Sequence, residues 1–331
     1  MQRSLVVSSS PHLRNERVST RGLMTDVVIA LLPAAIASVW FFGGSALMLM
    51  LVATATAVLT EFLYQKMTGQ RVTVGDMSAV VTGLLLAFNL PASAPWWLAV
   101  IGSVIAILLV KQIFGGVGNN FVNPALAART ILMLSWTTLM AARVLPHAGV
   151  WVAPEVADAI ASVTPLGEKA ASYSLWQLFA GDVPGMLGET SKLALTLGGL
   201  YLLVRRVIDW RIPVTFIATA FILFWIQTGT VYSVESGAQN ALYQLLSGGL
   251  LLGAFFMATD YVTSPVTPLG RIIMGVGCAA MLFVIRAFNP AYPEGCSFAI
   301  LFMNVLTPLI DKLTTPKPFG TLKAAKATKE V

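Results

Sequence analysis

The stretch Gly83-Leu84-Leu85-Leu86-Ala87 decides the fold, because a near copy of it stands half a chain later. The copy is Gly249-Leu250-Leu251-Leu252-Gly253, at an offset of 166 residues in a chain of 331. Each copy runs into a break that contains proline, Asn89-Leu90-Pro91 in the first case and residues 260–265 in the second. A motif that recurs at half the chain length is typical of a duplicated fold.

The composition indicates an integral membrane protein. Hydrophobic residues make up 56% of the chain and charged residues only 11%, against about 25% charged residues in a soluble domain. This excludes an ordinary water-soluble enzyme, a disordered chain and a partner of nucleic acid. The two cysteines, Cys278 and Cys296, and the two histidines, His12 and His147, are too few for an iron–sulfur, zinc or haem site. No metal site is expected, so a redox role requires an organic cofactor.

Ten stretches approach the roughly 20 apolar residues that a transmembrane helix needs. The predicted spans are residues 22–42, 45–65, 77–90, 96–113, 124–141, 192–207, 212–228, 240–258, 271–288 and 295–312. The motif Asn-Pro-Ala, at 123–125 and 289–291, recurs beside the fifth and tenth spans. Since each half has an odd number of spans, a duplication places the halves in opposite orientations, as in transporter folds. The predicted fold is therefore an all-α polytopic membrane protein with two inverted five-helix repeats, unless the similar Gly/Leu helices align by chance.

The distribution of lysine and arginine predicts the orientation in the membrane. Sixteen of the 21 basic residues fall on the side of the two termini and four on the other, which makes both termini cytoplasmic. The loop at 142–191 is then extracytoplasmic, and its length indicates a functional segment. The predicted parts are a cytoplasmic N-terminal segment (1–21), a first repeat (22–141), this outer loop, a second repeat (192–312) and a cytoplasmic basic tail (313–331).

Four acidic residues lie in or beside the spans toward the cytoplasmic side: Glu61, Asp76, Asp260 and Asp311. Ionisable groups within a membrane are costly and usually functional, so these four are candidates for a cation path. The alternative is that they cap helices or reach the headgroups; Asp76, before Met77-Ser78, has the position of a cap. Arg129 within the fifth span has two open interpretations, reaching the interface or binding an anionic or carbonyl-rich ligand.

Two similar strings stand on opposite sides of the predicted membrane. Val163-Thr164-Pro165-Leu166-Gly167 lies in the outer loop, and Val266-Thr267-Pro268-Leu269-Gly270 lies on the cytoplasmic side. A turn or a helix cap is the simplest role for either threonine. The outer loop ends in Gly188-Glu189-Thr190-Ser191, where a helix start would suit an anion such as phosphate. The glycine-rich run 115–120 fits neither the P-loop nor the dinucleotide-binding pattern.

These strings resemble a family of membrane subunits in ion-translocating redox complexes. The family includes the D subunit of the Rnf ferredoxin:NAD oxidoreductase and the B subunit of the sodium-pumping NADH:quinone oxidoreductase, and the short N-terminal segment favours the former. The resemblance covers nearly the whole chain. It is carried by residues 15–17, 76–79, 82–86, 94–97, 111–112, 123–125, 188–191, 253–256, 259–260 and 308–311.

The resemblance implies that a threonine of the outer loop carries FMN through a phosphoester bond. In the family an aspartate precedes that threonine by six residues, and here Asp158 precedes Thr164 by six. The run Ala161-Ser162-Val163 departs from the usual Ser-Gly-Ala-like run. Because the family's flavin transferase acts outside the cytoplasm, the orientation selects Thr164 over Thr267.

The resemblance also implies a non-covalent riboflavin in the helix bundle. The candidate flavin contacts are Arg129, Asn120, Asn123, Glu189 and Thr190. The implied function is electron transfer between ferredoxin and NAD coupled to Na⁺ or H⁺ translocation, by a redox subunit that is not an enzyme by itself. The implied partners are the other complex subunits, including a second flavin-bearing one, and the implied location is the bacterial cytoplasmic membrane.

Two other classes of function compete with this interpretation. One is a non-redox channel or small-solute transporter with the same inverted-repeat architecture, and the other is a scaffold for partner subunits. The spacing from Asp158 to Thr164 in an outer loop favours the redox interpretation, since a solute channel has no reason to keep it.

Overall fold

The computed structural model describes residues 19–147, 165–166, 173–232, 240–289 and 294–316, and within them the regular elements are helices. Five of these helices are long and apolar enough to cross a membrane, and four shorter apolar helices accompany them. This confirms the predicted all-helical polytopic membrane protein. The inverted relation of the two halves and the division into domains stay predictions.

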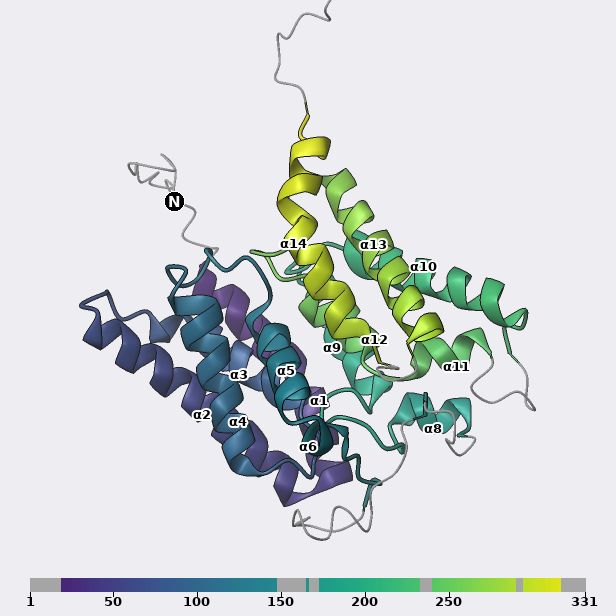
Figure 1. Ribbon diagram of the computed structural model, residues 1–331, viewed down its shortest axis with the longest axis horizontal. Helices are drawn as coiled ribbons and strands as arrows, with labels where there is room; N and C mark the ends of the chain where they lie inside the picture. Colours follow the sequence, from purple (N-terminus) through teal and green to yellow (C-terminus); the bar gives the residue numbers. More distant parts are fainter. Residues whose placement is uncertain (1–18, 148–164, 167–172, 233–239, 290–293, 317–331) are drawn as a thin grey trace, which may run out of the picture.

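The first half of the chain forms one group of helices (Figure 1). Its elements are α1 (Thr20–Phe42), α2 (Gly44–Met67), η1 (Val74–Asp76), α3 (Ser78–Phe88), α4 (Trp96–Val104), the π-helical η2 (Ile105–Gln112), α5 (Pro124–Ser135) and α6 (Thr137–Ala141). Local sequence explains several boundaries. The Ser19 side chain accepts the Gly22 N–H at the start of α1, and Asn123 caps α5 directly before Pro124.

The second half forms the other group (Figure 1). Its elements are α8 (Leu175–Ala180), α9 (Lys192–Val204), α10 (Arg211–Thr228), α11 (Ala241–Leu246), α12 (Leu250–Leu252), the π-helical η4 (Gly253–Met257), α13 (Pro268–Phe288) and α14 (Cys296–Thr314). Each of the ten predicted stretches therefore contains helix. The prediction of a continuous helix over 240–258 is wrong, because Ser247-Gly248-Gly249 interrupts it and Gly248 is left-handed with φ 66°.

The two groups pack along α1 and α9 and along α5 and α14. Small residues permit this close approach: a Cβ on Gly198 of α9 would collide with the Ala30 backbone oxygen of α1. Within the first group, a Cβ on Gly83 would lie 2.7 Å from Thr54 Cα of α2. Such small-residue contacts are common between membrane helices, whose association depends on close packing.

Polar contacts gather four helix ends at one end of the bundle. Asp26 near the start of α1 pairs with Arg205 after α9 at 3.2 Å. The loop before α13 meets the last turns of α14 through the Val266 N–H, which donates to Asp311 Oδ1 at 3.0 Å. The start of α1 and the end of α14 both lie on the upper side of Figure 1. Which side of a membrane this end occupies remains the prediction made from the basic residues.

The last part of the predicted outer loop lies inside the protein. Residues 183–192 are buried, and their backbone runs along the break that follows α3. The Leu187 N–H donates to Leu90 O at 3.0 Å, and the Gly188 N–H donates to Phe88 O at 2.9 Å. The Ser38 hydroxyl of α1 donates to Leu187 O at 2.6 Å. This segment therefore belongs to the packed interior between the halves.

Candidate functional site

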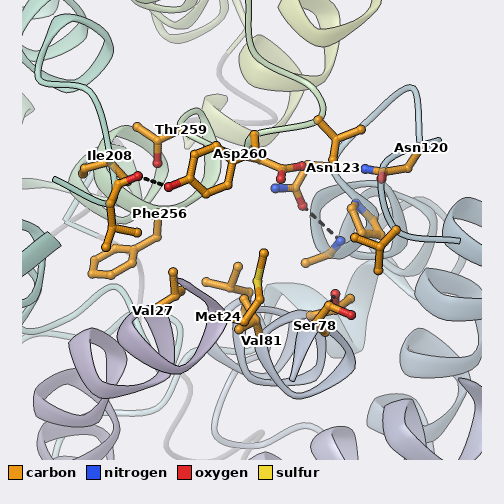
Figure 2. Close-up of a pocket in the computed structure, with 18 of the residues that line it drawn as sticks. Met24, Val27, Ser78, Val81, Asn120, Asn123, Ile208, Phe256, Thr259 and Asp260 are labelled. Carbon is orange, nitrogen blue, oxygen red and sulfur yellow. Dashed lines mark hydrogen bonds between the residues drawn. The ribbon is translucent and has the colours of Figure 1, made fainter. Parts of the chain in front are cut away.

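A central cavity of about 100 Å³ lies between the two groups of helices (Figure 2). Apolar side chains of α1 and α3, among them Met24, Val27 and Val81, form one wall. The opposite wall carries polar groups from the loop before α5 and from the segment after η4. They are Asn120, Asn123, Thr259 and Asp260. An apolar cavity with a few convergent polar groups is the usual form of a binding site.

Asn123 fixes one edge of this cavity. Its side-chain oxygen accepts the N–H groups of Ala125 and Leu126, at 3.1 and 3.2 Å, and so caps α5. Its Nδ2 donates to the Met257 carbonyl oxygen at the end of η4, at 3.3 Å. One asparagine therefore joins the start of α5 in the first half to the end of η4 in the second. Asp260, three residues after Met257, accepts a hydrogen bond from the Thr263 hydroxyl at 3.2 Å.

A buried ion pair borders the cavity. Lys111 of η2 donates from Nζ to Glu61 Oε2 of α2 at 2.8 Å, and also to Ser78 Oγ at 2.7 Å. The two side chains are 4% and 0% exposed. Gln112 Nε2 donates to the other Glu61 oxygen at 2.8 Å. The carboxylate is therefore fully engaged, and its lysine partner lines the cavity.

The four predicted acids thus occupy different surroundings. Asp260 lines the central cavity. Glu61 does not line it but pairs with Lys111, which does. Asp76 accepts the Ser78 N–H at 2.8 Å, which is the expected capping role, and Asp311 holds the loop before α13. The cation path itself stays a prediction.

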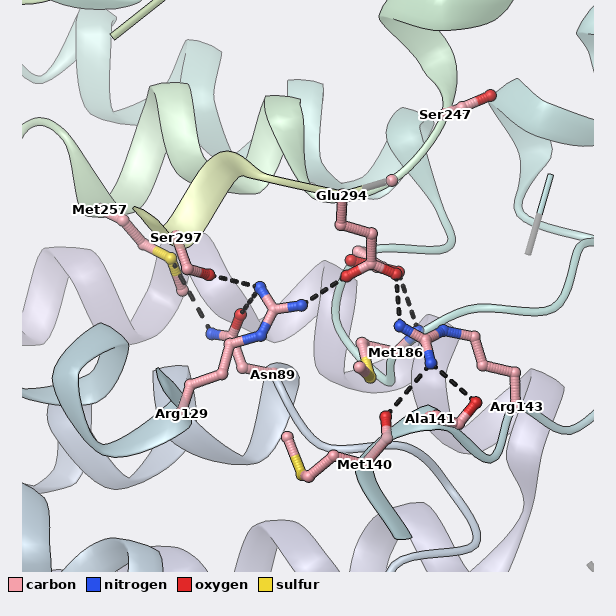
Figure 3. A network of polar contacts seen from close by, with 12 residues as sticks. Asn89, Arg129, Met140, Ala141, Arg143, Met186, Ser247, Met257, Glu294 and Ser297 are labelled. Atoms are coloured by element: carbon pink, nitrogen blue, oxygen red, sulfur yellow. Dashed lines mark hydrogen bonds and ion pairs between the residues drawn. The ribbon is translucent and has the colours of Figure 1, made fainter. Parts of the chain in front are cut away.

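A second polar network surrounds Glu294 (Figure 3). We call it the outer network, because the end of the predicted outer loop, with Glu189 and Thr190, lies beside Glu294. Glu294, just before α14, accepts from Arg129 Nη2 at 2.5 Å and from Arg143 Nη2 at 2.6 Å. Arg129 also donates to Asn89 Oδ1 at 3.0 Å and to Ser297 Oγ at 2.6 Å. Arg129 is 3% exposed, so the interpretation that it reaches the membrane interface is wrong.

The helix break at Ser247-Gly248-Gly249 joins this network. Lys192 donates from Nζ to the carbonyl oxygens of Glu189 and Gly248, the latter at 2.7 Å. Arg286 donates to Gln244 O at 2.6 Å and to Ser247 O at 3.0 Å. The break exposes carbonyl groups that a continuous helix would use, and the two cations satisfy them.

The predicted flavin contacts separate into two places. Asn120 and Asn123 line the central cavity, whereas Arg129, Glu189 and Thr190 belong to the outer network. The Glu189 carboxylate turns back to accept the Met186 N–H at 3.0 Å. The Thr190 hydroxyl is buried without a hydrogen-bond partner in the part of the chain that the structure describes. Ser191 caps α9 by accepting the Ala194 N–H, so this helix starts where the sequence predicted.

The outer network carries more positive than negative charge. Arg129, Arg143, Lys192 and Arg286 face only two carboxylates among the described residues, those of Glu189 and Glu294. Buried charges are normally paired, so this arrangement suits an anion. Pro165 lines a small cavity together with Lys192, Glu189 and Glu294. The segment that directly follows Thr164 therefore lies against the network, while Thr164 and Asp158 are outside the described residues.

Thr267, the threonine in the similar string, has a structural role. Its side chain accepts the Gly270 N–H at 3.0 Å and caps α13, with Pro268 as the first helical residue. It also shares a hydrogen bond of 2.5 Å with Thr314. The hydroxyl is thus occupied by contacts within the protein.

The sequence interpretation missed the partners of these groups. Lys111 counted as a basic residue of the cytoplasmic side and as part of the family resemblance, and its pairing with Glu61 was not foreseen. Arg143, Lys192 and Arg286 likewise served only the orientation argument, and Glu294 was not singled out. A charged residue in a chain with so few charges was the available signal, because burial of such a group demands a partner.

Comparison with known proteins identifies the family. Residues 6–320 match the NQR2, RnfD, RnfE family. The chain belongs to this family.

Relatives within this family are similar over nearly their whole length. The chain is 46% identical to the D subunit of a Na⁺-translocating ferredoxin:NAD⁺ oxidoreductase complex from Acetobacterium woodii, with 98% of each chain covered. It is 42% identical to the D subunit of a proton-translocating ferredoxin:NAD⁺ oxidoreductase complex from Clostridium ljungdahlii, covering 95% of this chain and 96% of the relative. It is 39% identical to the D subunit of an ion-translocating oxidoreductase complex from Stutzerimonas stutzeri, covering 95% and 98%. The family resemblance drawn from the sequence is therefore confirmed.

Proposed function

We propose that this protein is the membrane-embedded D subunit of an ion-translocating ferredoxin:NAD⁺ oxidoreductase complex, with FMN bound covalently to Thr164. The near full-length similarity to three D subunits of such complexes supports the membership. The outer network carries the flavin assignment, because it places excess positive charge against the residues that follow Thr164. FMN brings a phosphate that is anionic, and arginine and lysine are the usual partners of phosphate.

The described residues fit the FMN phosphate in charge and in free donor groups. The Nε atoms of Arg129, Arg143 and Arg286 are buried without partners among the described residues, as is the Thr190 hydroxyl. Lys192 and Arg143 are the residues we expect to hold the anionic end of the group. When bound, the flavin supplies the capacity to accept and release one or two electrons. The protein contributes a rigid, positively charged support, since its arginines are fixed by Glu294 and by backbone carbonyls.

The central cavity is the place we propose for the non-covalent riboflavin, but its present size does not fit. Ligand pockets generally measure about 300–1,000 Å³, and this one measures about 100 Å³. A flavin ring enters only if side chains such as Met24 or Phe256 move. We therefore assign no step of electron transfer to this cavity.

For the coupled ion, Na⁺ or H⁺, we propose that Asp260 acts from the wall of the central cavity. Its carboxylate lines that cavity, whereas the Glu61 carboxylate is engaged by Lys111 and Gln112. Asp76 and Asp311 stay candidates with structural contacts of their own. We expect Asp260→Asn to reduce ion translocation with covalent flavin retained, and Asp182→Asn, an exposed aspartate away from the cavity, to leave both unchanged.

The remaining parts of the proposal concern partners and place. We propose a bacterial cytoplasmic membrane location with both termini cytoplasmic, so that Thr164 faces outward. There a flavin transferase forms the phosphoester, and a second flavin-bearing subunit exchanges electrons with FMN. The alternative function, a non-redox channel or solute transporter of the same architecture, predicts no covalent flavin at all.

The test is flavin fluorescence of the denatured full chain in a gel, after co-expression with a flavin transferase. We expect a fluorescent band for the wild type and none for Thr164→Ala. The matched control is Thr267→Ala in the similar string, which should keep its fluorescence. A dark wild-type band, or fluorescence that survives Thr164→Ala, would contradict the flavin assignment and favour the channel or transporter. Full electron transfer in Thr164→Ala would favour the scaffold.

A further inference from the structure

A second, larger cavity lies near the start of α10 and the start of α13. It has a volume of about 570 Å³ and is formed by the turn between α9 and α10, the segment after η4 and the first turn of α13. Its polar lining includes Arg206, Asp209, Trp210, Tyr261, Ser264 and Arg271. We call it the arginine cavity. Its volume falls within the range of small-molecule pockets, about 300–1,000 Å³.

The charge of the arginine cavity is unbalanced. Asp209 Oδ2 accepts from both Arg211 Nη1 and Arg271 Nη1, at 2.7 and 2.6 Å, so one carboxylate serves two guanidinium groups. The guanidinium of Arg206 has no ion pair or hydrogen bond within the described residues, and neither has Nη2 of Arg271. These free donors, together with the net positive charge, suit a phosphate-type anion.

The surroundings of the cavity indicate the headgroup level of a membrane. The last turns of α9 present apolar side chains outward, with Leu200 54% and Val204 81% exposed. In a membrane protein such a surface faces lipid. Directly after it come Arg205 and Arg206, and then Trp210, which is 56% exposed. Tryptophan and arginine beside an apolar surface are typical of the membrane–water interface.

We propose that the arginine cavity binds the phosphate headgroup of an anionic phospholipid, with Arg206 and Arg271 as the principal donors. A lipid fits better than a soluble anion, because the cavity lies beside a lipid-facing helix surface where acyl chains can follow the headgroup. Basic pockets between membrane helices are known to take such headgroups.

The arginine cavity shares a wall with the central cavity, so a lipid bound in the first can affect the second. Val207, Ile208, Thr259 and Tyr261 line both the arginine cavity and the central cavity. The Tyr261 hydroxyl donates to the Val207 carbonyl oxygen across this shared wall. A headgroup in the arginine cavity therefore supports the wall of the central cavity from behind.

The test measures binding of lipid to the delipidated full chain in a neutral detergent. Phosphatidylglycerol, phosphatidylcholine, inorganic phosphate and a short polyglutamate peptide are compared by native mass spectrometry and by thermal stability. We expect phosphatidylglycerol alone to remain bound and to raise the unfolding temperature. Arg206→Gln should weaken that binding about fivefold, which corresponds to about 1 kcal/mol for one basic residue at a membrane surface.

The matched control is Arg71→Gln, an exposed arginine outside the cavity, which should leave binding unchanged. The Arg206 side chain makes no contact on which folding depends, so its variant remains folded and the comparison is clean. Equal effects of the two variants, or equal binding of phosphatidylcholine, would overturn the proposal. Protection by inorganic phosphate as strong as that by the lipid, or by polyglutamate, would also overturn it, in favour of a soluble anion or an acidic protein partner.

Discussion

The buried pair of Glu61 and Lys111 gives the sharpest prediction about stability. Glu61→Gln removes the carboxylate that pairs with Lys111. The ammonium then remains buried with the Ser78 hydroxyl as a hydrogen-bond partner and with Asp260, which lines the same cavity, as a more distant opposite charge. Breaking a buried ion pair from one side costs about 3–5 kcal/mol. We expect a loss of this size in the free energy of unfolding. Its physical cause is the uncompensated charge, not the loss of a favourable contact.

The double variant separates these causes. In Glu61→Gln/Lys111→Met the buried charge is gone, and replacement of a buried pair by residues of similar volume is often neutral. We therefore expect the double variant to regain most of the stability lost by the single one. The measurement is reversible unfolding in mixed micelles with increasing denaturing detergent, followed by tryptophan fluorescence and analysed as a double-mutant cycle.

The control for this cycle is the Asp26–Arg205 pair, whose arginine is 56% exposed. Solvent screens such a pair, so Asp26→Asn should change stability far less. If Glu61→Gln were as mild as Asp26→Asn, or if the double variant were less stable than either single variant, the account of a desolvated, charge-balanced pair would be refuted.

Two further predictions concern packing and pH. Gly83→Ala should destabilise the protein by about 1–3 kcal/mol in the same unfolding assay, because the new Cβ would lie 2.7 Å from Thr54 Cα; Gly75→Ala, with open space around it, should be neutral. Although partial burial opposes it, the hydrogen bonds from Arg211 and Arg271 hold the pKa of Asp209 below its usual 3.8. The charged pairing therefore stabilises the fold above pH 3.8 and is lost as the pH falls through the lowered pKa, so the stability difference between wild type and Asp209→Asn should shrink there. If the stability difference between wild type and Asp209→Asn stayed constant as the pH was lowered well below 3.8, the stabilising role of the Asp209 ion pairs would be contradicted.

The sequence predicted the helices well because apolar length is a strong signal in a membrane protein. Each predicted stretch contains helix, and Pro91 and Asn123-Pro124 mark boundaries that the structure retains. The interruption at Ser247-Gly248-Gly249 was not predicted. In the sequence its glycines form part of the copied motif within an apolar run. In the structure Lys192 donates to Gly248 O, and Arg286 donates to Gln244 O and Ser247 O, so the break is held by residues from other parts of the chain.

The site was harder to predict than the fold, since its contacts join residues far apart in sequence. Asp76 beside Ser78 was predicted as a cap from a local rule, and it is found. Asn123 caps α5 by the same rule, although that role was not predicted. The partners Glu61–Lys111 and Arg129–Glu294 are 50 and 165 residues apart. No local pattern pairs them. The burial of 183–192 escaped prediction for the same reason, because a polar outer loop gives no sign that its end packs between two helix groups.

The central claim is that Thr164, and not the similar Thr267, carries the flavin. Tryptic peptides of the purified wild-type chain separate the two threonines: cleavage after Arg143 and Lys169 releases residues 144–169, and cleavage after Arg211 and Arg271 releases residues 212–271. Mass spectrometry should find the first peptide heavier by FMN less one water, with the added mass on Thr164, and the second peptide unmodified. An unmodified first peptide from protein matured with a flavin transferase, or the added mass on Thr267, would contradict the claim.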